Sequence, residues 1–144
     1  MSRFNVFPDA EAAVSKAIRD AGFRAYSSIP KKPTWPLFVV QRLGGQPPVR
    51  QYLDEARIQV DAWGGASGDG VPVPVSKGDL HDIAQEARVA IFNLEGTTVH
   101  DPVDAFISGV DDALGLSWLP DPVTGRDRYI FSLYLYLRSA PDEM

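Results

Sequence analysis

The sequence predicts a single domain of the α+β class, with two helices and about five strands. Two stretches, residues 10–21 and 80–94, repeat apolar residues at helical spacing. Residues 56–63 alternate apolar and polar side chains, as a strand with one buried face does. The 144-residue length suits one domain that buries a core of its own.

The first helix is expected to begin near Pro8 and Asp9, because proline suits the first helical position and an acid suits the positive end of the helix dipole. Gly22 is a natural stop. The buried stripe predicted for this first helix consists mostly of alanine, which allows close approach to a sheet. It comprises Ala10, Ala13, Val14, Ala17, Ile18 and Ala21.

Three strands are predicted next, over residues 24–29, 37–43 and 56–63. The proline-rich residues 31–36 form a stiff connection between the first two. Glycines and prolines at residues 44–48 predict a turn after the second. The third strand places apolar residues on one side, and its polar side ends in a tryptophan, Trp63, that is expected to be exposed.

Residues 64–75 are rich in glycine and proline and predict a long mobile loop. Ser76 and Asp79 resemble a capping box that opens the second helix, and Gly96 is placed to end it. A fourth strand is predicted over residues 106–116 and a turn over residues 118–122. The buried stripe of the second helix is predicted from its spacing to be Leu80, Ile83, Ala84, Ala87, Ile91 and Leu94.

The last strand, residues 126–138, has two faces that are both suited to contact. Two helices on one side of a sheet cover only one face, so the second face indicates contact with another subunit, whereas burial within the same domain is the alternative. Aromatic residues at strand ends, in loops and on this second face are typical of protein interfaces. The interface candidates are Trp63, Tyr134, Tyr136, Ile130, Trp35 and Trp118.

Composition excludes several functional classes. The chain has no cysteine, which rules out disulfides, thiolate metal sites and cysteine nucleophiles. A net charge of −5 argues against nonspecific nucleic-acid binding, which needs clustered Lys and Arg. No window is long and apolar enough for a membrane span, and no signal peptide is recognisable, so we expect a soluble protein made inside a cell.

No motif predicts catalysis, a cofactor or a metal. Gly65 and Gly70 have the spacing of a phosphate-binding loop, but Val71 and Pro72 stand where that motif requires Lys and Ser or Thr. His81 is expected to be solvated or capping, and His100 to be a loop residue. Five aspartates lack the register of a calcium loop and suit turns instead: Asp101, Asp104, Asp111, Asp112 and Asp121.

The order of these segments resembles the tail terminator proteins of long-tailed phages, especially phages of actinobacterial hosts. The resemblance covers nearly the whole chain and lies in the opening at residues 7–11, the strands at residues 36–45 and 56–63, the helix at residues 79–94, the turn at residues 118–122 and the strand at residues 128–138. It implies a mixed, mostly antiparallel sheet with two helices packed on one face.

The resemblance also implies a homohexameric ring in the virion, at the end of the tail that faces the head. Such a ring caps the tail tube, stops its polymerisation and joins the tail to the head connector, so its partners are the tube protein and a head-closure protein. Genomic DNA would pass through the lumen without specific binding, and the acidic net charge suggests a lumen that does not hold it. The family offers no active-site residues to transfer.

Two alternatives stay open. Another head–tail connector component, such as a head-closure or tail-completion protein, would share the size and the lack of catalytic motifs. A small enzyme or ligand-binding domain would instead use residues 64–75 as a lid, with His81 or His100 as acid or base, and would have a deep pocket converging on a histidine.

Overall fold

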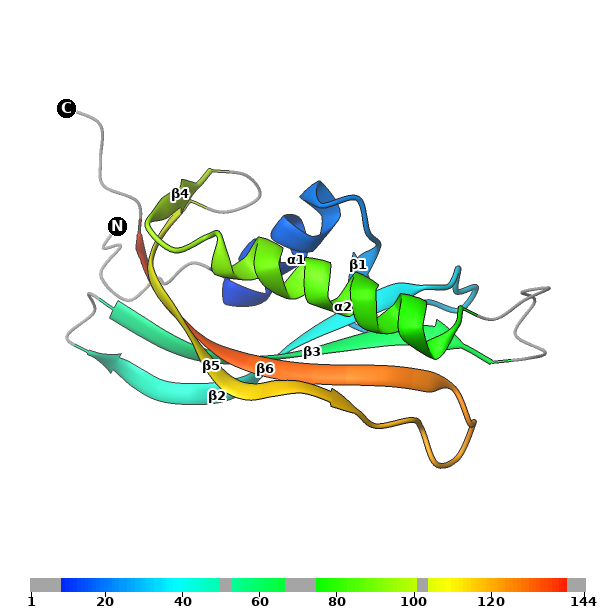
Figure 1. Cartoon of the computed structure of the whole chain (residues 1–144). Helices are drawn as coiled ribbons and strands as arrows, with labels where there is room; N and C mark the ends of the chain where they lie inside the picture. Colours follow the sequence, from blue (N-terminus) through cyan, green and yellow to red (C-terminus); the bar gives the residue numbers. More distant parts are fainter. Residues whose placement is uncertain (1–8, 50–52, 67–74, 101–103, 140–144) are drawn as a thin grey trace.

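A computed structural model describes residues 9–49, 53–66, 75–100 and 104–139. Within them the chain forms two helices and one six-stranded sheet with the strand order β1-β2-β3-β6-β5-β4 (Figure 1). The pairing is antiparallel except between β1 and β2. The elements are α1 (Ala10–Asp20), β1 (Ala25–Tyr26), β2 (Leu37–Val49), β3 (Leu53–Gly65), α2 (Lys77–Phe92), β4 (Thr97–Val99), β5 (Ala105–Trp118) and β6 (Asp127–Ser139). The predicted fold class, with both helices on one face of a mixed sheet, is confirmed.

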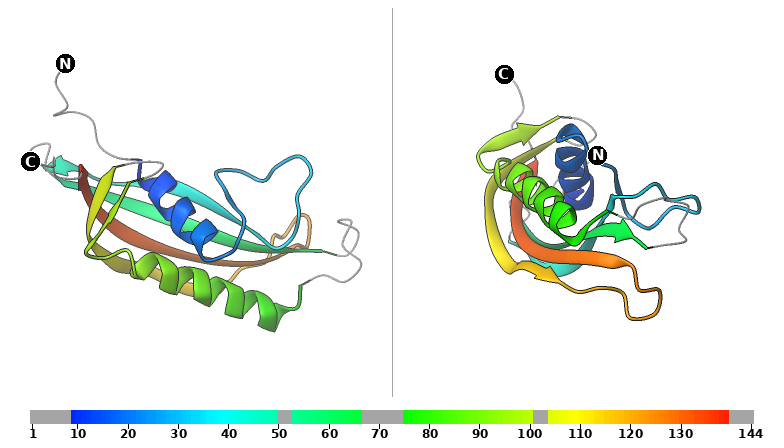
Figure 2. Two further views of the ribbon diagram at one scale, coloured as in Figure 1. Left: turned by 90° about the horizontal axis from the view of Figure 1, so that it is seen from above. Right: turned by 45° about the vertical axis from the view of Figure 1, so that its right-hand side comes forward.

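The sheet curls around the two helices, so that α1 and α2 lie in its concave side (Figure 2). The core fills the space between them. The inward face of β6 contributes Phe131, Leu133, Leu135 and Leu137, all fully buried. Against these side chains pack the alternating apolar residues of β3 and the apolar stripes of the helices. This arrangement leaves the convex side of the sheet without a helical layer.

α2 begins directly after the predicted cap, Ser76, whereas α1 begins at Ala10, slightly later than predicted, with Asp9 as its N-terminal cap. The side chain of Asp9 accepts a hydrogen bond from the amide of Ala12, and Ser76 Oγ accepts one from the amide of Asp79. Gly22 follows α1 with a φ of +99°, a conformation that glycine adopts without strain. Four residues of the predicted α2 stripe are buried, and Ile83 and Leu94 pack partly buried against the same core.

The predicted turn at residues 44–48 is wrong, because β2 continues to Val49. Gly44, with a φ of +131°, lies beside a bulge at Leu43, and pairing with β3 resumes at Gly44 itself, opposite Arg57. Pro47 and Pro48 fall at the second register shift, where no pairing with β3 is formed. Glycine and proline therefore mark irregularities within this strand and not its end.

Further expectations need correction. The strand predicted over residues 24–29 is reduced to the two residues of β1. A short strand that was not predicted, β4, pairs with the start of β5 and forms one edge of the sheet. Three residues are too few for alternation to be visible in the sequence. The predicted loop at residues 64–75 begins too early, because Gly64 and Gly65 are buried residues at the end of β3, and residues 67–74 of it lie outside the described part of the chain.

Candidate assembly interface

The convex side of the sheet, which we call the outer face, carries a mixture of polar and aromatic side chains. On β6 it presents Ile130, Ser132, Tyr134 and Tyr136, which alternate with the buried leucines. Their register partners on β3 are, in the same order, Asp61, Gln59, Arg57 and Glu55. Neither helix lies over this face (Figure 1).

One end of the outer face is covered by the chain itself. Trp35, from the connection between β1 and β2, forms a small apolar cluster with Leu37, Val39 and Trp63. Trp35 and Trp63 are each only 6% exposed. The expectation that Trp63 is exposed is therefore wrong, because the connection places a second tryptophan beside it.

Two arginines complete this cluster. The guanidinium of Arg126 lies 5.2 Å from the ring centroid of Trp35, and that of Arg128 lies 4.8 Å from the ring centroid of Trp63. Arg128 also donates to the carbonyl of Leu119 at 2.8 Å. The tryptophan rings are thus engaged within the subunit and contribute to its stability.

Trp118 lies on the opposite side of the sheet from the outer face. Its ring meets that of Tyr129, a core residue, with 5.0 Å between centroids, and the ammonium of Lys77 lies 4.4 Å from its centroid. Trp118 therefore closes the end of the core beneath α2. The structure does not bring it together with Tyr134 and Tyr136.

Tyr134, Tyr136 and Ile130 are half-buried on the outer face of the isolated chain. Tyr136 packs over Gly109 of β5, where an added Cβ would come within 3.2 Å of its ring. Partial burial raises the pKa of Tyr136, and the nearby carboxylates Glu55 and Asp111 raise it further. These three residues remain candidates for contact with another subunit.

Asp61 is the buried acid of the outer face. Its carboxylate accepts a hydrogen bond from Gln59 Nε2 at 2.9 Å and lies 3.9 Å from Arg128 Nη1. Burial raises the pKa of Asp61, against the opposing effects of Gln59 and Arg128. The neighbours of Asp61 are an amide and a guanidinium, so it is a structural carboxylate held by donors.

His81 and His100 are both exposed. His81 Nδ1 lies 3.4 Å from the carboxylate of Asp82, and its ring meets the edge of Tyr129. His100 Nδ1 lies 3.3 Å from a carboxylate oxygen of Asp104. Neither imidazole is within hydrogen-bond distance of a described Ser, Thr or Lys side chain that it could activate.

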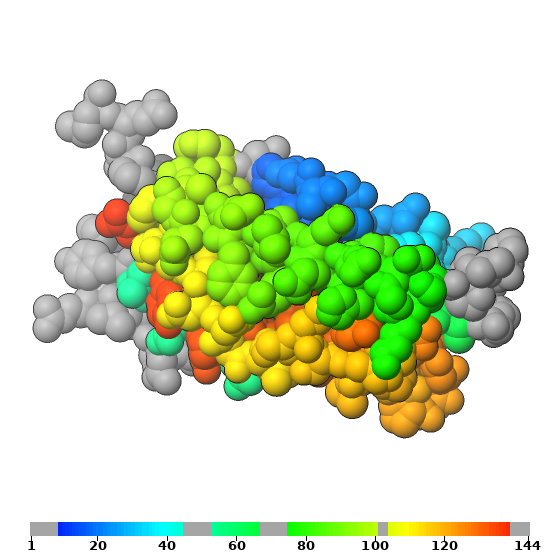
Figure 3. Space-filling model, in the orientation of Figure 1, coloured from blue at the N-terminus to red at the C-terminus, as the bar shows by residue number. Residues whose placement is uncertain are grey.

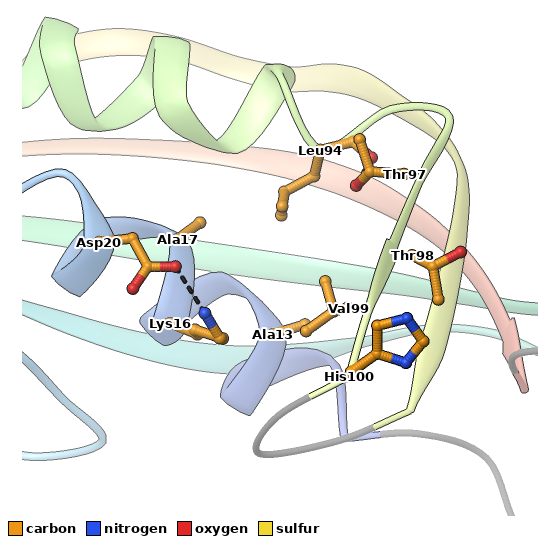
Figure 4. A pocket seen from close by; sticks show the side chains of 9 residues that line it. All are labelled: Ala13, Lys16, Ala17, Asp20, Leu94, Thr97, Thr98, Val99 and His100. Carbon is orange, nitrogen blue, oxygen red and sulfur yellow. Dashed lines mark hydrogen bonds and ion pairs between the residues drawn. The ribbon is translucent and has the colours of Figure 1, made fainter.

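His100 lies at the rim of an open groove of about 410 Å³ between α1 and β4 (Figure 4). Lys16 and Asp20, which both line the groove, form an ion pair in which the ammonium nitrogen lies 2.6 Å from a carboxylate oxygen. Small and aliphatic side chains provide much of the remaining lining. The groove is lined by Ala13, Lys16, Ala17, Asp20, Leu94, Thr97, Thr98, Val99 and His100.

In the described ranges, no helix is long and apolar enough to cross a membrane, and no three His, Asp or Glu residues are grouped as metal ligands would be. No known family model matches the sequence, and no curated protein matches it.

Proposed function

We propose that this protein is the tail terminator of a long-tailed phage, a structural virion protein that forms a ring on the head-proximal end of the tail. The ring would stop polymerisation of the tail tube and present a surface to the head-closure protein. The resemblance of the sequence to that family motivates the proposal. The observation that carries it is the outer face, on which two tyrosines and an isoleucine are half-exposed and uncovered by either helix.

The outer face has the chemistry of an assembly surface. Tyrosine provides a large rigid apolar area together with a hydroxyl group, and such residues carry much of the binding energy at protein interfaces. Glu55, Arg57 and Asp111 surround Tyr134 and Tyr136 with charges of both signs. Aromatic residues within a polar rim are typical of a non-obligate interface.

The test is to image tail tubes by negative-stain microscopy after mixing them with the purified protein, and to weigh the protein alone by mass photometry. We expect a closed ring, or a distinct cap on one end of tubes of uniform length. Binding to a head connector without any effect on tubes would instead favour a different connector component. A monomer that ignores both would contradict the proposal.

A double variant links this activity to the outer face. Tyr134→Ala with Tyr136→Ala is expected to remain folded and to lose ring formation or tube capping. Val89→Ala, at an exposed position on α2, is the control for loss of an apolar side chain elsewhere on the surface. Circular dichroism establishes that both variants are folded, and unaltered capping by the double variant would exclude the two tyrosines from the interface.

A further inference from the structure

The charges of this chain are separated along its length in a way that the net charge conceals. Residues 21–53 contain no Asp or Glu, whereas residues 89–125 contain no Lys or Arg. The described basic residues of the first segment are Arg24, Lys31, Lys32 and Arg42, and the described acidic residues of the second are Glu95, Asp104, Asp111, Asp112 and Asp121.

The fold places these two segments at opposite edges of the sheet. The first contains β1 and β2, and the second contains β4 and β5, at the two ends of the strand order. In the right-hand view of Figure 2, β4 and β5 lie on one side of the molecule, and the connection that follows β1 lies on the other. Figure 3 shows β5 at the surface along the length of α2.

We define the basic flank as Arg24, Lys31 and Lys32, and the acidic flank as Glu95, Asp104, Asp111 and Asp112. All seven side chains are exposed. None of the three basic residues forms an ion pair within the described part of the chain, while on the acidic flank Asp112 is paired with Arg88 and Asp104 with His100. Each flank therefore keeps charge that is not neutralised within the subunit.

We propose that the basic flank of one copy of this chain docks on the acidic flank of the next copy. Two basic flanks repel one another, and so do two acidic flanks, which disfavours a two-fold dimer through either surface. A basic flank against an acidic flank is a head-to-tail contact, and such contacts form a ring when the rotation closes. The inference rests on the ring of the proposed function and names the surfaces that close it.

Exposed apolar side chains accompany the charges on both flanks. Ile29 is exposed two residues before Lys31, Leu43 is exposed on β2, and Leu114 is exposed on β5 two residues after Asp112. Asp111 lies opposite Tyr134 in the β5–β6 register. A copy docked on the acidic flank thus also reaches the edge of the outer face, so one contact combines charge pairing with burial of apolar area.

The docking is expected to use side chains and not to continue the sheet. β1 pairs with β2 only at Phe38 and Val39, so β2 has an open edge beyond them. On that edge the amide of Arg42 already donates to Glu11 Oε2 at 3.0 Å. On the open edge of β5, the amide of Val110 donates to Glu95 Oε1 at 3.1 Å. These carboxylates compete with a neighbouring strand for the backbone.

The test is charge reversal followed by mixing. Lys31→Glu with Lys32→Glu makes both flanks acidic. Asp104→Lys with Asp111→Lys places two cations on the acidic flank, where only Glu95 and the Arg88-paired Asp112 remain acidic. Sedimentation velocity is measured for each variant alone and for an equimolar mixture. We expect each variant alone to lose self-association by about tenfold or more, and the mixture to recover it, because the two variants can alternate around an even-numbered ring.

Two controls separate flank docking from general charge effects. Asp82→Lys with Glu86→Lys reverses two exposed acids on α2 and is expected to leave association unchanged. For wild type, raising the salt from about 0.1 M to about 1 M is expected to weaken association strongly, because the screening length falls from about 10 Å to about 3 Å. If circular dichroism shows that a reversal variant is unfolded, a charge-removing variant replaces it. These variants are Asp104→Asn with Asp111→Asn for the acidic flank and Lys31→Gln with Lys32→Gln for the basic flank.

Rings that persist in both reversal variants would overturn the docking of the two flanks, but they would still support the proposal that the protein forms a ring. Loss of association in both variants without recovery in the mixture would also overturn it. Wild-type protein that stays monomeric at low salt would exclude flank docking as well, since the attraction is greatest there. Capping of tail tubes is measured separately, so failure of the flanks and failure of the terminator proposal remain distinguishable.

Discussion

Gly65, at the end of β3, combines a left-handed backbone conformation with close packing against Trp35. Its φ is +79°, and a Cβ built there would lie 2.7 Å from Cγ of Trp35. A side chain at this position would push the tryptophan away from Trp63 and open the cluster at the end of the outer face. Glycine is therefore needed for its close approach to an aromatic ring as well as for its backbone freedom.

Gly65→Ala is expected to lower the free energy of unfolding by about 2 to 3 kcal/mol, of which about 1 kcal/mol comes from the left-handed conformation and the rest from displacement of Trp35. Gly96→Ala is a matched control, because Gly96 has a φ of +78° and nothing within 4 Å of an added Cβ. Urea denaturation measures both variants. Equal losses would show that Trp35 moves aside freely.

Asp61 predicts a pH dependence of stability. Because burial raises its pKa, the folded protein binds a proton there more tightly than the unfolded chain does. The contribution of Asp61 to stability therefore becomes less favourable as the pH rises from about 4, the unfolded pKa, through the raised folded pKa. Asp61→Asn is expected to be more stable than wild type at neutral pH. Its free energy of unfolding is expected to lack the decrease with rising pH that Asp61 causes in wild type.

Urea denaturation between about pH 2 and about pH 7 tests this expectation, because this range includes the titration of Asp61 and that of its control, Asp121. Asp121 is a control of opposite sign, since a hydrogen bond from Thr124, followed by one from the amide of Val123, lowers its pKa. The stability that Asp121 contributes is present above its unfolded pKa and is lost as the pH falls through the lowered value. An Asp61→Asn variant that is less stable than wild type at neutral pH would show that the carboxylate, with Gln59 and Arg128, stabilises the fold.

At the scale of elements, α2 depends on its N-terminal cap. Ser76→Ala removes the acceptor for the amide of Asp79 and is expected to lower the free energy of unfolding by about 1 kcal/mol. Ser76→Asp retains an acceptor at the same place and is expected to remain near wild type. Thermal or urea unfolding followed by circular dichroism compares the two variants, and a Ser76→Ala variant as stable as wild type would indicate that α2 is held by its packing alone.

The elements that were predicted correctly are those with long periodic patterns. Both helices and the strands at residues 56–63 and 126–138 lie where alternation or helical spacing placed them. The errors concern short or interrupted segments. Pairing with β3 resumes after Leu43 and again after Pro47 and Pro48, so β2 continues past these irregularities. Pairing with β5 likewise produces β4. In both cases a partner distant in the sequence decided the local structure.

At the scale of the whole molecule, β6 separates the two faces of the sheet. Leu135 is fully buried beneath the helices, whereas its neighbour Tyr134 is half-buried on the outer face. Leu135→Ala is expected to lower the free energy of unfolding by about 3 kcal/mol, and Tyr134→Ala by about 1 kcal/mol or less. Urea unfolding measures both, and similar large losses would place Tyr134 in the core and remove the basis for an outer interface.

The sequence alone determined the class of fold, the two helices with their caps, and the alternation that divides β6 into a buried face and a second face. These depend on local periodicity and on residues close together in the chain. Only the tertiary structure decided which aromatic residues remain partly exposed on the second face. It buried Trp35 with Trp63 and placed Trp118 on the core side, because those positions depend on how a connection folds over the sheet. It also placed the basic and acidic segments at opposite edges, since strand order is set by long-range pairing.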